Sequence, residues 1–214
     1  MKKRMKGFYL SIGLLCGFIL WTIAVRFFDV QPIGPQGSSV GFAELNQYFH
    51  NLLGVHFVLY MITDWLGLVP LCVCMGFGIL GLRQWIVKKK LMEVDRDLLA
   101  LGGFYIATMA VYVLFEIFVV NYRPVLLEGI LEPSFPSSTT MLTLCVMPTA
   151  IMQFNARIKN RILKQWVVGL TSLFIIFMVI GRLVSGVHWI TDIIGGILLS
   201  AGLVTMYDSV SGWR

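Results

Sequence analysis

The chain has 214 residues, of which 57% are hydrophobic and 13% are charged, and its mean hydropathy is +0.82. Soluble domains carry about 25% charged residues, and a soluble protein of this length could not bury so much apolar surface, so lipid must cover part of it. This composition excludes a soluble enzyme, a secreted disulfide scaffold, a disordered linker and a nucleic-acid-binding module. We therefore interpret the net charge of +6 as a topology signal rather than a DNA-binding face.

Six apolar stretches are long enough to cross a bilayer of about 30 Å as helices. They lie near residues 7–28, 56–83, 98–120, 137–155, 165–184 and 188–207. The first is longer than the roughly 7–15 apolar residues of a signal peptide and no small-x-small cleavage site follows it, so we expect an uncleaved span. The second is long enough to include a piece at the membrane interface. The chain is predicted to be one all-α membrane domain over residues 1–214, a bundle of six transmembrane helices.

Basic residues predict the orientation of this bundle, because cytoplasmic connections are enriched in Lys and Arg. Of the 17 Lys and Arg, all but Arg26, Arg123 and Arg182 fall on one set of connections, which includes the N-terminal segment and Arg214. We therefore expect a multi-pass cell-membrane protein with both termini in the cytoplasm. The segments 29–55, 121–136 and 185–187 are predicted to face outward.

The first outward segment begins as a loop rich in Pro, Gly and Ser. Within it, apolar residues recur at helical spacing over residues 42–53, which predicts a short amphipathic helix on the outer membrane surface.

Two further features concern packing rather than chemistry. Gly196 and Ser200 have the spacing that allows another helix to approach closely. The four cysteines lie inside apolar runs with no histidine at metal-ligand spacing, so we interpret them as small buried hydrophobic residues. No metal or other cofactor is predicted, since the outward side carries no cluster of carboxylates and histidines.

Arg123 and Arg182 stand out because each is placed at the outer end of a predicted span, where an unpaired arginine is costly. An anionic ligand at the outer surface is one suitable partner. A structural ion pair, with Glu128 or Glu132 as the acid, is the other, and these two arginines alone do not distinguish them.

His188 and Asp192 are four residues apart at the start of the sixth span, so on a helix they share one face. Asp192 can then accept the proton of one ring nitrogen and leave the other as an outward lone pair, and the nearby helix N-terminus disfavours imidazolium. The interpretations are a histidine nucleophile or a satisfied structural pair. The segment Pro136-Ser137-Ser138 resembles a helix start, whose free N–H groups either bind phosphate or are simply capped.

Taken together, these segments resemble the type 2 phosphatidic acid phosphatase (PAP2) superfamily of six-span membrane lipid phosphatases. The family motifs are Lys-x6-Arg-Pro, Pro-Ser-Gly-His and Ser-Arg-x5-His-x3-Asp. The third is matched at Arg182, His188 and Asp192 with full spacing, with Gly181 in place of the serine. Arg123-Pro124 matches the first motif and Pro136-Ser137 the second.

The resemblance implies the roles of these residues. His188 would form a phosphohistidine, Asp192 would orient it, and a phosphate would be bound by Arg123, Arg182, Ser137, Ser138 and the helix start. The implied partner is a lipid phosphate or diphosphate of the bilayer.

Two departures from the family bear on activity. Glu116 stands where the family has lysine, and Ser138-Thr139 replaces Gly-His. The missing histidine is the family's general acid, and a threonine hydroxyl does not release its proton near neutral pH. We expect Glu116 to pair with Arg123 or Arg182; recognition of a cationic head group is the alternative.

The leaving group decides how much the missing acid matters. A monophosphate ester expels an alkoxide, whereas a diphosphate expels a phosphate monoester with a second pKa of about 6, which can leave unprotonated. The sequence therefore favours a phosphatase or phosphotransferase acting on a prenyl diphosphate such as undecaprenyl diphosphate. The alternative is a catalytically impaired protein that binds or transports a lipid phosphate. His50, His56 and Asp64 are candidate proton donors from outside the motifs.

Overall fold

A computed structural model describes residues 2–211 of the chain, so Arg214 lies outside the described residues. The long and short α-helices are α1 (Lys2–Phe27), α2 (Ala43–Leu53), α3 (Phe57–Leu66), α4 (Leu68–Lys88), α5 (Arg96–Ile117), α6 (Ser138–Arg157), α7 (Arg161–Val184) and α8 (Ile190–Ser211), with single 3-10 turns at Pro35–Gly37 and Leu91–Glu93. The protein is thus all-helical over the described range, apart from isolated β-bridges.

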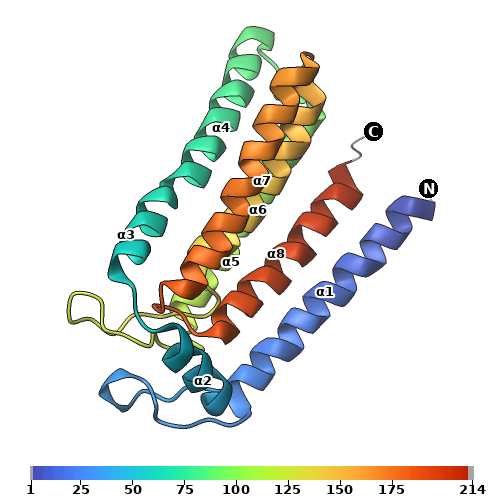
Figure 1. Cartoon of the computed structure of the whole chain (residues 1–214). Coiled ribbons are helices and arrows are strands. Elements are labelled where there is room, and N and C mark those ends of the chain that lie inside the picture. Colours follow the sequence, from blue (N-terminus) through green and yellow to red (C-terminus); the bar gives the residue numbers. More distant parts are fainter. Residues whose placement is uncertain (1, 212–214) are drawn as a thin grey trace.

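The long helices run roughly along one direction and α1 lies against α8 over its length (Figure 1). The start of α1 and the end of α8 lie at the same end of the bundle as the α4–α5 and α6–α7 connections. The opposite end carries α2, the long connection between α5 and α6, and the turn between α7 and α8. The three segments predicted to face outward therefore lie together at one end.

Five helical stretches are long and apolar enough to cross a membrane. They are Arg4–Phe27, Phe57–Lys88, Arg96–Ile117, Arg161–Val184 and Ile190–Ser211. The fourth predicted span, residues 137–155, forms α6, a helix of 20 residues that is not apolar enough to count among these candidates. It is an interior helix whose polar side chains are buried in the bundle, among them Thr140, Thr143, Thr149 and Gln153.

The second predicted span is divided. α3 ends at Leu66, and α4 begins at Leu68 and continues to Lys88, five residues beyond the predicted end. Pro70, in the first turn of α4, has no N–H to donate to the carbonyl of Leu66, so one helical hydrogen bond is missing at this junction. This break turns α3 toward the end of the bundle that holds α2 (Figure 1).

Small residues of α8 allow it to pack closely on α6, as expected. A Cβ on Gly196 would lie 3.3 Å from the carbonyl oxygen of Ser137, and Ser200 donates a hydrogen bond to the carbonyl of Met141 at 3.2 Å. A Cβ on Gly195 would lie 2.6 Å from the ring of Phe135. Because of this packing, the first turn of α6 lies beside the first turn of α8.

Candidate active site

The turn between α7 and α8 places His188. The turn needs a glycine at Gly186, whose φ is +70° and whose Cβ would collide with the backbone of Gly54. α8 begins only at Ile190, so His188 precedes the helix instead of lying in its first turn as the spacing predicted. Asp192 accepts a hydrogen bond from the backbone N–H of Trp189 at 2.9 Å, and its Oδ2 is 3.7 Å from His188 Nδ1. The Asp192 carboxylate therefore faces the His188 ring, and its shorter contact stabilises the turn that carries His188.

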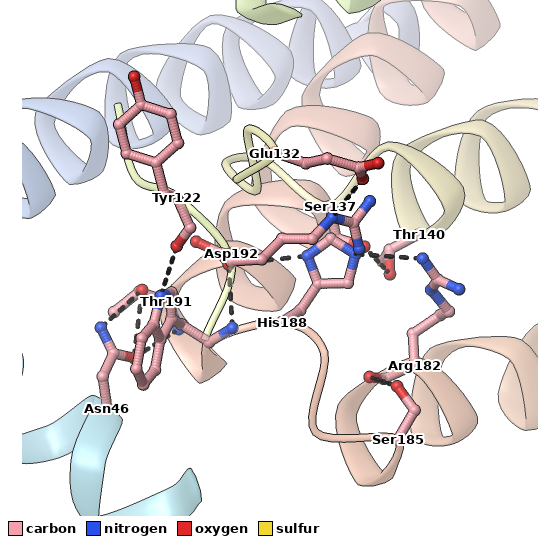
Figure 2. A network of polar contacts seen from close by, with 12 residues as sticks. Asn46, Tyr122, Glu132, Ser137, Thr140, Arg182, Ser185, His188, Thr191 and Asp192 are labelled. Atoms are coloured by element: carbon pink, nitrogen blue, oxygen red, sulfur yellow. Dashed lines mark hydrogen bonds and ion pairs between the residues drawn. The ribbon is translucent and has the colours of Figure 1, made fainter. Parts of the chain in front are cut away.

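The other ring nitrogen of His188 faces two arginines. Arg123 Nη1 lies 3.3 Å from Nε2 and Arg182 Nη2 lies 3.2 Å from it. Figure 2 shows Arg182 directed toward the His188 ring. Guanidinium nitrogens only donate hydrogen bonds, so Nε2 must be the acceptor and the ring proton must be on Nδ1. This tautomer leaves a lone pair directed between two cations.

The charge state of His188 follows from the same surroundings. The side chain is 4% exposed, and this burial, followed by the charges of Arg123 and Arg182, lowers its pKa well below the ordinary value of 6.5. A neutral imidazole has the lone pair that nucleophilic attack requires.

Arg123 is held by the connection between α5 and α6. Its backbone N–H donates to the carbonyl of Glu132 at 3.0 Å, and a bridge pairs Tyr122 with Pro133. Its Nε forms an ion pair with Glu132 Oε2 at 3.0 Å. Glu132, one of the two acids expected as a partner, therefore orients Arg123 while Nη1 remains directed at His188.

Arg182 is 1% exposed, and part of its guanidinium group contacts α3. Its Nη1 lies 3.5 Å from both Thr63 Oγ1 and Asp64 Oδ1, and its Cζ lies 5.1 Å from the centre of the Tyr60 ring. No motif in the sequence indicates that α3 supports the site. The available signal was Asp64 itself, a carboxylate within an apolar run.

The prediction that Glu116 pairs with Arg123 or Arg182 is wrong. Glu116 is exposed near the end of α5, and the ion pairs of the arginines go to Glu132 and Asp64 instead. The prediction assumed one continuous helix, in which Glu116 and Arg123 would lie two turns apart on nearly the same face. α5 ends at Ile117, so this assumption fails. Glu116 instead lines a small cleft with Tyr112 and Ser138.

At the start of α6, where a phosphate cradle is predicted, Ser137 is already engaged in hydrogen bonds within the protein. The hydroxyl of Ser137, which is fully buried, donates to Thr140 Oγ1 at 3.0 Å, and its N–H bonds the carbonyl of Asp192 at 3.1 Å. Figure 2 draws this hydrogen bond between Ser137 and Thr140 in the same view as His188. Thr139 is half-buried beside the α3–α4 junction, where its Cγ2 would lie 3.3 Å from a Cβ on Gly67.

Among the three proton donors considered outside the motifs, Asp64 contacts the site through Arg182. His56 Nε2 lies 2.9 Å from the carbonyl oxygen of Leu53, and the His50 ring lies 5.4 Å from that of Trp189. Within residues 2–211, no group of three His, Cys, Asp or Glu side chains has an arrangement that could hold a metal ion.

A neutral imidazole lone pair between two buried guanidinium groups is suited to a tetrahedral oxyanion, because each arginine can donate to phosphate oxygens while the ring faces phosphorus. The bundle and this arrangement define a class: a multi-pass helical membrane protein with a site suited to phosphoryl groups.

The chain belongs to the PAP2 superfamily, whose profile matches residues 97–213. Among solved structures it is similar to the first transmembrane PAP2 type phosphatidylglycerolphosphate phosphatase from Bacillus subtilis, with a TM-score of 0.54, 18% identity and 94% of each chain covered. A search of curated proteins gave no match. The family expected from the motifs is therefore confirmed, and the likeness in structure extends over nearly the whole chain.

Proposed function

We propose that the protein is a membrane lipid phosphatase or phosphotransferase that acts through a phosphohistidine at His188. The observation that carries this proposal is the approach of Arg123 and Arg182 to the unprotonated Nε2 of His188, at 3.3 and 3.2 Å. Both arginines would bind the transferred phosphate, and charge that develops on its oxygens would be stabilised by donors already in place. Asp192 would stabilise the ring as it becomes positively charged on phosphorylation.

The favoured substrate class is a prenyl diphosphate, such as undecaprenyl diphosphate. Thr139 occupies the position of the family's general acid, and a diphosphate is the substrate whose leaving group departs without one. The similar Bacillus subtilis protein is a phosphatidylglycerolphosphate phosphatase, which supports a lipid phosphate as the broader class.

The second candidate function is a lipid-phosphate binding or transport protein without turnover. The replacement of Gly-His by Ser138-Thr139 favours it, because the same arginines would bind phosphate whether or not a proton donor is present. The two functions differ in one measurable quantity, the release of inorganic phosphate.

The decisive experiment is a panel of lipid monophosphates and diphosphates incubated with the full chain in detergent or in lipid discs. We expect phosphate release from prenyl diphosphates, and none from His188→Ala, while lipid binding by this variant stays largely intact. Tight binding of the panel with no release from any member would favour the binding protein instead.

The site is proposed to lie at the outer leaflet of the cell membrane, in a bundle of six crossings with both termini in the cytoplasm. The distribution of basic residues supports this orientation. A cysteine at Gln36 should react with an impermeant thiol reagent on intact cells and one at Lys89 should not. The reverse labelling would move the site to the cytoplasm.

A further inference from the structure

Asp64 is an acidic residue in an unusual place. It lies in α3, within the apolar stretch Phe57–Lys88 that is a candidate membrane span. Ionisable residues in such segments are costly and are retained where they serve a function. The side chain is 55% exposed, whereas Arg182 beside it is 1% exposed. Asp64 therefore lies where the buried site meets the surface of the protein, at the end of the bundle that holds α2 and the α7–α8 turn.

One guanidinium group joins this carboxylate to the nucleophile. Arg182 uses Nη1 toward Asp64 Oδ1, at 3.5 Å, and Nη2 toward His188 Nε2, at 3.2 Å. A phosphoryl group on Nε2 would therefore be one guanidinium width from the carboxylate. The positive charge between them reduces the repulsion between two anions.

Glu132, the other acid paired with a site arginine, is arranged differently. It binds Arg123 twice, through its backbone carbonyl to the N–H and through its carboxylate to Nε, both at 3.0 Å. Nε is not the atom that Arg123 turns toward His188, since that contact uses Nη1. Glu132 is thus built to orient an arginine. Asp64 makes a longer contact, at 3.5 Å, with the guanidinium group of Arg182, which also reaches His188 Nε2. The Asp64 carboxylate is therefore held less tightly and can accept a proton from another molecule.

The proposed reaction requires a base that the residues already assigned do not provide. After phosphoryl transfer, Nε2 of His188 is bonded to phosphorus and cannot accept a proton. Asp192 is fully buried and faces the opposite ring nitrogen at 3.7 Å. Thr139, at the edge of the site beside Gly67, has no group that accepts a proton near neutral pH.

Resting on the function proposed above, we infer that the Asp64 carboxylate is the general base that activates water to hydrolyse the phosphohistidine. In the first step the Nε2 lone pair forms a bond to the terminal phosphorus, and the P–O bond breaks with its electrons on the departing lipid phosphate. In the second step water bonds to phosphorus and gives one proton to Asp64. The P–N bond electrons return to Nε2, and Asp64 later releases its proton to solvent.

The test separates the two steps. The full chain is mixed with farnesyl diphosphate carrying ³²P in the terminal phosphate, and acid-labile protein-bound ³²P and free phosphate are followed in time. For Asp64→Asn we expect phosphate release to fall by about 10²–10⁴-fold, the usual range for loss of general base catalysis. Labelled protein should accumulate, because its formation does not need the base.

Glu132→Gln is the matched control, since it removes the carboxylate paired with the other arginine. It should raise the substrate concentration needed for labelling without accumulation of labelled protein. The inference is overturned if Asp64→Asn turns over at the wild-type rate, or if it behaves like Glu132→Gln. If the wild-type chain neither releases phosphate nor becomes labelled, the proposed function fails and the inference fails with it. An unchanged melting temperature of Asp64→Asn, expected for a half-exposed side chain, verifies that the fold is intact.

Discussion

The α8 helix and the α3–α4 pair face different surroundings although both are strongly apolar. Half of the most apolar stretch of α8 is buried inside the protein, but only 6% of that of α3–α4. α8 packs against α1 and α6 and fixes Asp192 and the turn of His188, whereas α3 touches the site from its edge through Thr63 and Asp64. The proposed nucleophile His188 is thus held by a packed core, and the proposed base Asp64 comes from a peripheral helix.

Because of this difference, we expect substitutions in the two regions to affect different steps of the proposed reaction. Alterations in the core should affect whether phosphate binds and whether His188 is poised to attack. Alterations at the edge should affect which leaving groups depart and how fast the intermediate is hydrolysed. The following variants test that separation.

The largest effect is expected at Thr139, which lies in the first turn of α6 beside the α3–α4 junction. The wild type should cleave a prenyl diphosphate faster than its monophosphate, with a gap approaching the roughly 10²–10⁴ of general acid catalysis. Thr139→His should narrow the gap by raising monophosphate turnover selectively, with Ser138→Gly added to make room for the imidazole. Thr139→Gln, whose amide group is not an acid near neutral pH, is the control. Equal wild-type rates on the two substrates would show that another group already supplies the proton.

The next effect is in the core. Arg182→Ala should weaken lipid-phosphate binding by roughly 2–5 kcal/mol, because a desolvated charge contact is lost. Arg182→Lys should recover only part of this, since an ammonium group lacks the planar fork. Arg157→Ala, which removes the pairs with Asp95 and Asp97 at the other end of the bundle, should leave binding unchanged. Normal phosphate binding by Arg182→Ala would make this arginine structural.

A smaller effect, on stability, is expected where α2 meets α8. Asn46 is fully buried and bonds the carbonyl of Gly41 at 2.7 Å and the hydroxyl of Thr191 at 3.0 Å. Asn46→Ala leaves these groups without partners and should destabilise the fold by about 1–3 kcal/mol. Thermal unfolding in detergent measures this against Gln47→Ala, an exposed neighbour on α2. Equal melting temperatures of the two variants would show that α2 is not anchored through Asn46.

The smallest effect concerns the protonation state of His188. Because burial and the two arginines lower the pKa of His188, its ring should remain neutral at pH 6, where an ordinary histidine is about three-quarters protonated. Nitrogen-15 NMR of the labelled side chain reports this directly, and protonation at pH 6 would remove the basis for a free nucleophile.

The sequence was sufficient for the helical membrane fold, because apolar runs are local signals. Its motifs also singled out Arg123, Arg182 and His188, and the structure brings these three within hydrogen-bonding distance. It could not locate the break before Pro70 or bring α3 against Arg182, since that contact joins residues 118 positions apart. It also assigned Glu116 to the arginines on the assumption of a continuous helix, which the end of α5 at Ile117 removes.

The central claim is that phosphate is transferred to His188. Brief incubation with ³²P-labelled farnesyl diphosphate, rapid quenching at alkaline pH and mass spectrometry of peptides would locate the transferred group. We predict an acid-labile, base-stable label on the peptide that contains His188, absent from His188→Ala. Phosphate release by His188→Ala at the wild-type rate, or a label on a different residue, would contradict the account.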